Sequence, residues 1–87
     1  MPHITLYHFE GCSACSRAKK WIEELRREKP ELAQVHIDMV DVHKTPGFKA
    51  PAPFYYVPTF FVDSRKALEG EVTKESVEDV LRQGLKA

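Results

Sequence analysis

The sequence predicts an α/β domain in which a four-stranded mixed sheet packs against flanking helices. Three observations indicate this fold class. Two stretches that alternate apolar and polar residues enclose a segment with helical periodicity, an aromatic and β-branched run follows later, and the chain ends in a second amphipathic segment. A length of 87 residues gives room for one hydrophobic core, so we expect a single domain over residues 1–87. The predicted order is β-α-β-(loop or short α)-β-β-α.

The first half of the chain predicts a strand–helix–strand unit. Residues 3–8, HITLYH, alternate and contain β-branched and aromatic residues, which is typical of a strand. A helix is expected from Ser13 to about Arg27, because apolar residues recur there at i, i+3, i+4 and i+7: Ala18, Trp21, Ile22 and Leu25. Residues 35–40, VHIDMV, predict the next strand, with Val35, Ile37 and Met39 on one side. Such a unit connects parallel strands.

The second half predicts a loop, two strands and a helix. Residues 43–53, HKTPGFKAPAP, contain three prolines and a glycine, which favour a loop or at most one helical turn. Residues 55–63, YYVPTFFVD, predict a strand, and a short strand is expected near 67–69. Thr73 is a candidate N-cap for a final helix, whose buried side would hold Val77, Val80, Leu81 and Leu85.

Composition and charge exclude several classes of function. The 13 basic and 13 acidic residues balance, which argues against binding to nucleic acid. No apolar run approaches the roughly 20 residues that span a bilayer, so we expect no association with a membrane. The start, MPHITLYHFE, lacks a basic segment followed by an apolar one, so we expect no signal peptide and a cytoplasmic location.

The chain has two cysteines, Cys12 and Cys15, within the stretch FEGCSACSRAKKW at residues 9–21. Thiols are mostly kept reduced in the cytoplasm, where a pair able to form a disulfide is more often catalytic than structural. A disulfide across so short a loop would also constrain the unfolded chain only weakly. The spacing therefore favours a redox pair over a structural disulfide.

The expected position of the pair assigns a different role to each thiol. A helix that starts near Cys12 would stabilise a thiolate there through its unpaired N–H groups and its dipole. Cys15 would lie one turn further and be more shielded, so Cys12 attacks a substrate disulfide and Cys15 resolves the mixed disulfide. Gly11 permits a sharp turn, and the small residues Ser13 and Ala14 leave the sulfur accessible.

With the strand, the Cys-x-x-Cys and the helix in place, and VPTFF at 57–61, the chain resembles the thioredoxin superfamily, and by size its glutaredoxin-like branch. The resemblance covers essentially the whole chain. It implies a thioredoxin fold and a thiol–disulfide oxidoreductase whose only cofactor is its own dithiol. It also implies a cis Pro58 facing the cysteines, a backbone at Val57 that pairs with substrate, and a substrate site that includes Thr59. The expected partners are protein disulfides, with a reductase or glutathione as electron donor, and we expect a monomer.

Departures from the family pattern bear on the substrate. Glutaredoxins usually carry a lysine three residues before the first cysteine, where this chain has Phe9, which we place in the substrate groove. They also carry a Gly-Gly motif after the fourth strand, where this chain has Gly70 followed by Glu71. Thioredoxins proper have Trp-Cys-Gly-Pro-Cys and a buried aspartate near the place of Leu6. These differences argue against glutathione as a strong ligand, although glutathione stays open as a co-substrate.

Two other functions stay open at this point. One is glutathione-dependent deglutathionylation, which needs Cys12 alone. The other is a redox-inert or metal-carrying adaptor with the same fold. We expect no metal site, because one cysteine pair without a partnering pair does not complete the four ligands of a closed zinc site. Among the four histidines, His8 is expected to face solvent near the end of the first strand, from where it could assist proton transfer.

Overall fold

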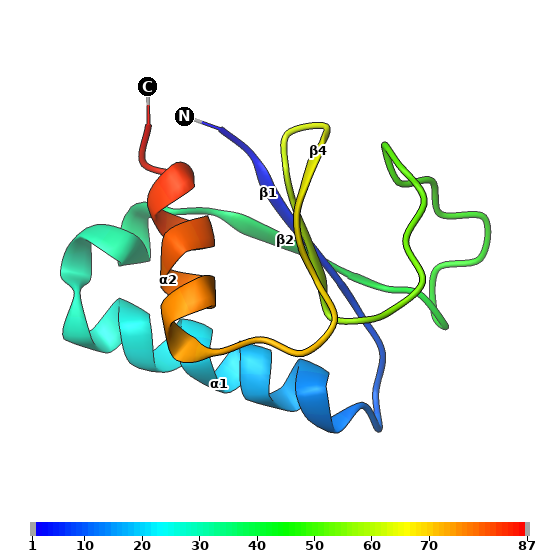
Figure 1. Cartoon of the computed structure of the whole chain (residues 1–87), viewed down its shortest axis with the longest axis horizontal. Helices are drawn as coiled ribbons and strands as arrows, with labels where there is room; N and C mark the ends of the chain where they lie inside the picture. Colours follow the sequence, from blue (N-terminus) through cyan, green and yellow to red (C-terminus); the bar gives the residue numbers. More distant parts are fainter. Residues whose placement is uncertain (1, 87) are drawn as a thin grey trace.

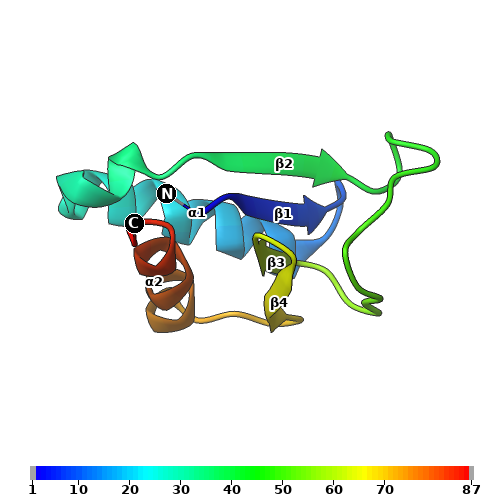
Figure 2. The same ribbon diagram turned by 90° about the horizontal axis from the view of Figure 1, so that it is seen from above.

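The computed structural model describes residues 2–86 as a mixed α/β fold with one four-stranded open sheet. The elements follow in the order β1 (Ile4–His8), α1 (Ser13–Glu28), the 3-10 helix η1 (Pro30–Gln34), β2 (Ile37–Asp41), β3 (Thr59–Val62), β4 (Arg65–Glu69) and α2 (Lys74–Gln83). The strand order across the sheet is β2-β1-β3-β4 (Figures 1 and 2). The predicted mixed sheet is confirmed: β1 and β2 are parallel, and β3 is antiparallel to both β1 and β4.

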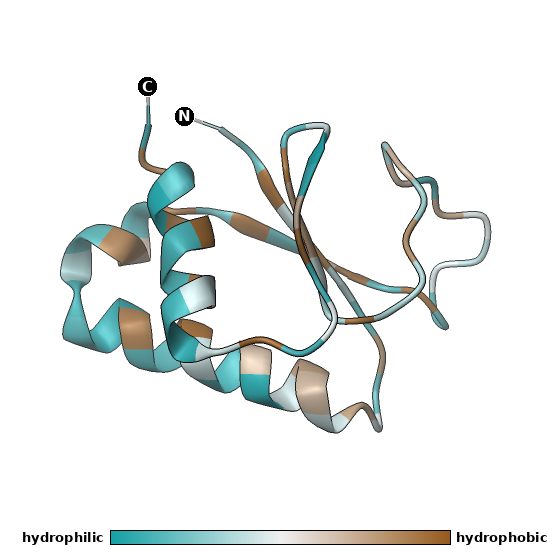
Figure 3. Cartoon of the chain, viewed as in Figure 1, coloured by the Kyte–Doolittle hydropathy of each residue, from teal (hydrophilic) through white to brown (hydrophobic). Residues whose placement is uncertain are grey.

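Both helices pack on one face of the sheet. Alternation along the strands puts Ile4 and Leu6 of β1 beside Phe60 and Val62 of β3, and all four side chains are buried. The buried sides of the helices cover them with Ala18, Ile22, Leu25, Val77, Val80 and Leu81. Hydrophobic and hydrophilic segments alternate along each helix, as expected for a helix with one buried side (Figure 3). The predicted stripes of both helices are therefore confirmed except at two positions: Trp21 is only half-buried, and Leu85 lies past the end of α2 and is partly buried.

The opposite face of the sheet is covered by the loop between β2 and β3. Phe48 and Phe54 of this loop lie against Tyr7 of β1, with ring centroids 5.5 and 5.0 Å from that of Tyr7. Phe61 of β3 completes this aromatic cluster. The loop lies at the end of the sheet where β1 turns into α1 (Figures 1 and 2). The prediction of a loop over residues 43–53 is confirmed, and its aromatic residues replace a helix as the cover of this face.

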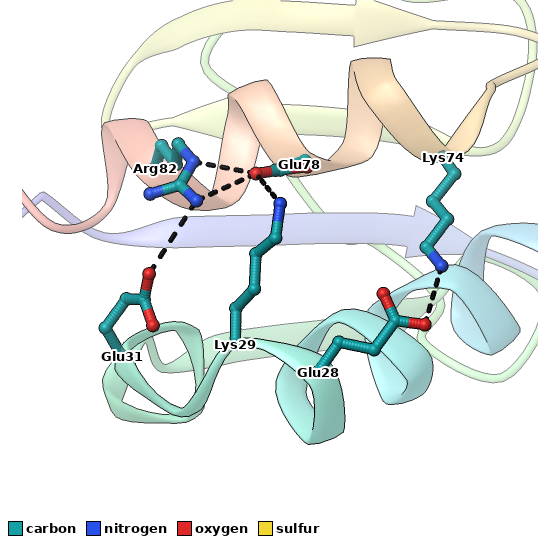
Figure 4. Close-up of polar contacts among 6 residues, drawn as sticks. All are labelled: Glu28, Lys29, Glu31, Lys74, Glu78 and Arg82. Atoms are coloured by element: carbon teal, nitrogen blue, oxygen red, sulfur yellow. Dashed lines mark hydrogen bonds and ion pairs between the residues drawn. The ribbon is translucent and has the colours of Figure 1, made fainter.

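Ion pairs and a cap hold α2 in its place. The carboxylate of Glu78 accepts hydrogen bonds from Lys29 at 2.6 Å and Arg82 at 2.8 Å, and Lys74 donates to Glu28 at 2.8 Å (Figure 4). Thr73 is the N-cap, as predicted, in a capping box with Ser76. Each exposed pair adds little free energy alone, but together they tie α2 to the C-terminal end of α1.

One local expectation was wrong. The strand expected over 55–63 begins only at Thr59, because the N–H groups before it bind the carboxylate of Glu69 instead of a neighbouring strand. The segment after α1 is a 3-10 helix that buries Leu32. Met39 lies on the same side of β2 as Ile37 but is 47% exposed, because β2 is an edge strand.

No helix within residues 2–86 is both long and apolar enough to cross a membrane.

Candidate redox site at the start of helix α1

Cys12 is the N-cap of α1. The chain leaves β1 at His8 and turns at Gly11, whose φ of +86° is a conformation that favours glycine. The carbonyl of Cys12 then accepts the first helical hydrogen bond, from Ser16 at 3.0 Å. The sulfur of Cys12 accepts a second one, from the backbone N–H of Cys15 at 3.1 Å. The predicted position of Cys12 at the helix start is confirmed, and its sulfur takes the role that a serine or aspartate oxygen has in other helix caps.

Cys15 lies inside the first turn of α1, and its side chain is buried. Burial raises the pKa of its thiol to about 11, and the hydrogen bond with Cys12 acts in the same direction. The backbone of Phe9 and the charge of Lys19 oppose this shift. Both cysteines are free thiols, and Cys12 is partly exposed. The predicted contrast between an accessible and a shielded cysteine is thus confirmed.

The segment before β3 lies opposite the sulfur of Cys12. The Val57–Pro58 peptide bond is cis, as the resemblance implied. The thiol of Cys12 points at the carbonyl oxygen of Val57, with 3.9 Å between sulfur and oxygen. Within the described residues 2–86, the N–H of Val57 has no backbone partner. The structure therefore brings Cys12 and Val57 together and leaves the N–H of Val57 without a backbone partner among residues 2–86.

The residues of the β1–α1 turn around Cys12 differ in exposure. Gly11 and Ser13 are exposed, and Ala14 is half-buried. Phe9 is half-buried and stacks on His43, with ring centroids 4.4 Å apart and an interplanar angle of 15°. The stack holds the ring of Phe9 against the loop after β2.

Pro58 and Thr59 follow Val57 directly, and both are buried. Thr59 is completely buried, and its hydroxyl donates a hydrogen bond to the carbonyl of Tyr56. The carbonyl of Pro58 accepts a hydrogen bond from Gly70 at 3.0 Å. Thr59 therefore fixes the course of the preceding segment through its side chain.

Ion pairs engage the charged residues around the site. Arg17 of α1 pairs with Glu71, which follows β4. Glu10 pairs with Lys44 at 3.1 Å. Glu71 and Glu10 thus each pair with a basic side chain.

The expectation for His8 was wrong. Its side chain is 8% exposed, because alternation along β1 places it on the helix-facing side with Ile4 and Leu6. Its Nδ1 is buried without a hydrogen-bond partner among residues 2–86. Burial, followed by the charge of Lys19, lowers the pKa of His8. The period of two along residues 4–8 was the signal that could have identified this buried histidine.

Tyr55 and Tyr56 lie on the surface, just before Val57. They are 85% and 70% exposed, so neither is part of the core. Their backbone N–H groups donate to the carboxylate of Glu69, a residue that sequence reasoning did not connect with the site. Next to them, a groove of about 420 Å³ is lined only by apolar residues: Phe48, Ala50, Pro51, Ala52, Pro53 and Phe54.

In the part of the chain that the structure describes, no three histidine, cysteine or acidic side chains gather closely enough to hold a metal ion. His3 and His36 instead flank the carboxylate of Asp38, at 2.6 and 2.7 Å.

A scan against models of known protein families finds none that matches this sequence, and no curated protein matches it either.

Proposed function

We propose that this chain is a thiol–disulfide oxidoreductase with a thioredoxin-like fold that reduces or oxidises protein disulfides through Cys12 and Cys15. The support comes from the arrangement of four features: a parallel β1–α1–β2 unit, a cysteine at the N-cap of α1, a second cysteine buried one turn later, and a Val-Pro segment facing them. A reducing compartment such as the cytoplasm would keep both thiols free until substrate arrives.

The observation that carries this proposal is the 3.9 Å contact between the sulfur of Cys12 and the carbonyl oxygen of Val57. An extended peptide that pairs with the backbone of Val57 would place its own disulfide next to this sulfur. The backbone then supplies orientation, and the helix start stabilises the attacking thiolate. The backbone that would bind the substrate and the sulfur that would attack it are therefore adjacent.

The reaction would run in two displacements. The thiolate of Cys12 attacks one substrate sulfur, a Cys12–substrate disulfide forms, and the other substrate sulfur leaves and takes a proton. Cys15 then loses its proton and attacks the sulfur of Cys12, which breaks the mixed disulfide and releases the second substrate thiol. Two electrons pass to the substrate, and a thiol reductant, either glutathione or a disulfide reductase, must return them.

The burial of Cys15 sets the order of these steps. In the reduced protein, burial and the hydrogen bond with Cys12 hold the pKa of Cys15 at about 11, so Cys15 stays protonated while Cys12 attacks. Formation of the mixed disulfide removes the negative charge of Cys12, and with it one of the causes that raise this pKa. Cys15 is therefore activated after the first displacement.

Protein disulfides fit this site better than glutathione. The place where glutaredoxins carry a lysine for a glutathione carboxylate holds Phe9, stacked on His43. The segment after β4 carries the carboxylate of Glu71. Because Arg17 pairs with this carboxylate, its guanidinium is already engaged. A carboxylate at this edge disfavours a second one from glutathione.

A redox titration in glutathione buffers tests the proposal, with alkylation and intact mass measured at each point. We expect a two-electron transition between the dithiol and a Cys12–Cys15 disulfide, with a midpoint in the range of about −270 to −120 mV. A persistent glutathione adduct on Cys12 would indicate glutathione-dependent chemistry instead. The absence of any transition would favour a redox-inert adaptor.

A further inference from the structure

The carboxylate of Glu69 fixes the segment that leads to Val57. It accepts hydrogen bonds from two consecutive backbone N–H groups, those of Tyr55 and Tyr56, the latter at 2.9 Å. It also pairs with Lys66 at 2.7 Å, and Lys66 donates to the carbonyl of Pro53 at 3.1 Å. One ion pair on β4 thus holds both ends of residues 53–56, and the Glu69 side chain is only 19% exposed. Such a contact orders the backbone before any substrate binds.

The two tyrosine rings contribute little to the folded core. They are 85% and 70% exposed, although an aromatic ring contributes most to the stability of a protein when it is buried. They directly precede Val57, whose carbonyl oxygen lies 3.9 Å from the sulfur of Cys12. Tyrosine is enriched at binding surfaces because it offers a large rigid contact area with few rotatable bonds. Two exposed aromatic residues therefore directly precede the residue whose carbonyl faces the sulfur of Cys12.

We propose that Glu69 positions Tyr55 and Tyr56 as a specificity surface for extended polypeptides that carry an aromatic or aliphatic side chain beside the reacting cysteine. This inference rests on the proposed function and names its substrate class. Backbone pairing at Val57 suits an extended chain, and neighbouring side chains of that chain then fall beside the tyrosines. Tyr55 is also adjacent to Phe54, one of the apolar residues that line the groove, so this side of the site offers apolar contacts rather than charge.

The test compares two peptides and one small probe. The peptides carry the same mixed disulfide and differ only in having phenylalanine or glycine two residues from the cysteine, and the probe is 2-hydroxyethyl disulfide, which has neither an aromatic ring nor a charge. Single-turnover rate constants are measured with the reduced protein. We expect wild type to favour the phenylalanine peptide by roughly threefold to tenfold, the range for one aromatic pair.

Variants separate the tyrosines from the chemistry. Tyr55→Ala and Tyr56→Ala are expected to lose most of this preference and to keep the rate with the small probe, whereas Tyr55→Phe and Tyr56→Phe keep both. Glu69→Gln should reduce the preference, because it weakens the hydrogen bonds that the N–H groups of Tyr55 and Tyr56 donate to this side chain. Glu71→Gln is the matched control and should keep the preference for the phenylalanine peptide, since that carboxylate pairs with Arg17 and is 70% exposed.

The outcomes distinguish the two proposals. Equal rates for the two peptides in wild type, or a preference that survives both alanine substitutions, would overturn the specificity surface and leave the oxidoreductase standing. Failure of wild type to react with any of the three disulfides would overturn both. Loss of preference in the alanine variants, with the small probe unaffected, supports the inference.

Discussion

The backbone N–H of Cys15 donates a hydrogen bond to the sulfur of Cys12 across 3.1 Å, while the thiol of Cys15 is itself buried. Cys15 thus binds the sulfur of Cys12 with its main chain, while its own side chain is shielded from solvent. Because the first N–H groups of a helix lack partners within the helix, this bond follows directly from the N-cap position of Cys12. The two thiols are therefore unequal before any substrate binds.

Alkylation of the native protein should distinguish these thiols. We expect iodoacetamide to add one label, at Cys12, because Cys15 is 1% exposed and its pKa of about 11 leaves roughly one thiol in a thousand ionised at pH 8. Intact mass before and after unfolding in urea measures this, with one label expected in the native protein and two after unfolding. Two labels added at similar rates to the native protein would contradict the assigned asymmetry.

Cys15→Ser should trap the mixed disulfide. Without the second thiol, the Cys12–substrate disulfide has no internal partner, so we expect a covalent adduct that disappears only when an external thiol is added. Mass spectrometry after mixing with a disulfide peptide measures the adduct, with Cys12→Ser as the control that forms none. If Cys15→Ser releases substrate as fast as wild type with glutathione present, the reaction uses one thiol and the deglutathionylation alternative gains support.

The sequence predicted the helices, the sheet and the cysteine geometry because each depends on short-range patterns. The apolar spacing along α1 and α2 placed Ala18, Ile22, Val77 and Val80 correctly in the core. The N-cap at Thr73 also follows from local chemistry, since a hydroxyl there binds the N–H three residues later. Spacing alone placed Cys15 one turn after Cys12, on the side of α1 that becomes buried.

The missed features depend on contacts between distant segments. A run such as YYVPTFFVD has the composition of a strand from its first residue, but Tyr55 and Tyr56 bind Glu69, 14 and 13 residues further along the chain. Periodicity gives no information about a carboxylate that competes for these N–H groups. The burial of His8 differs, because its signal was present in the alternation and was outweighed by the polar nature of histidine.

Acid should weaken the hold on the tyrosines. Lys66 and the two backbone N–H groups lower the pKa of Glu69 to about 2, below its ordinary value near 4.5. The native state therefore binds fewer protons than the unfolded state in this range, so the contribution of Glu69 to stability is complete above about pH 4.5 and is lost toward pH 2. Urea unfolding between these two pH values should show a smaller loss of stability for Glu69→Gln than for wild type. Glu71→Gln is the control, and identical pH slopes for all three proteins would contradict the assigned contact.

Mild acid should act through His8. Its imidazole is surrounded by Lys19 of α1, Asp41 of β2, and Glu10 and Lys44 of the adjoining loops, and burial together with Lys19 lowers its pKa. The unfolded chain then takes up a proton near pH 6.5 that the native chain does not, so the free energy of unfolding should fall as the pH drops from about 7.5 to about 5.5.

His8→Leu should remove part of this dependence, because it removes the imidazole that takes up the proton. Among residues 2–86 the Nδ1 of His8 has no hydrogen-bond partner to lose, and leucine is also the buried neighbour at position 6. Urea unfolding at both pH values measures the difference, with the exposed His43 changed to glutamine as the control. A wild-type stability that stays constant over this range, or one that falls equally in His8→Leu, would show that the native chain protonates His8 as readily as the unfolded chain. The sign follows from the location of His8, because burial lowers its pKa and its imidazole therefore takes up a proton more readily in the unfolded chain than in the native one.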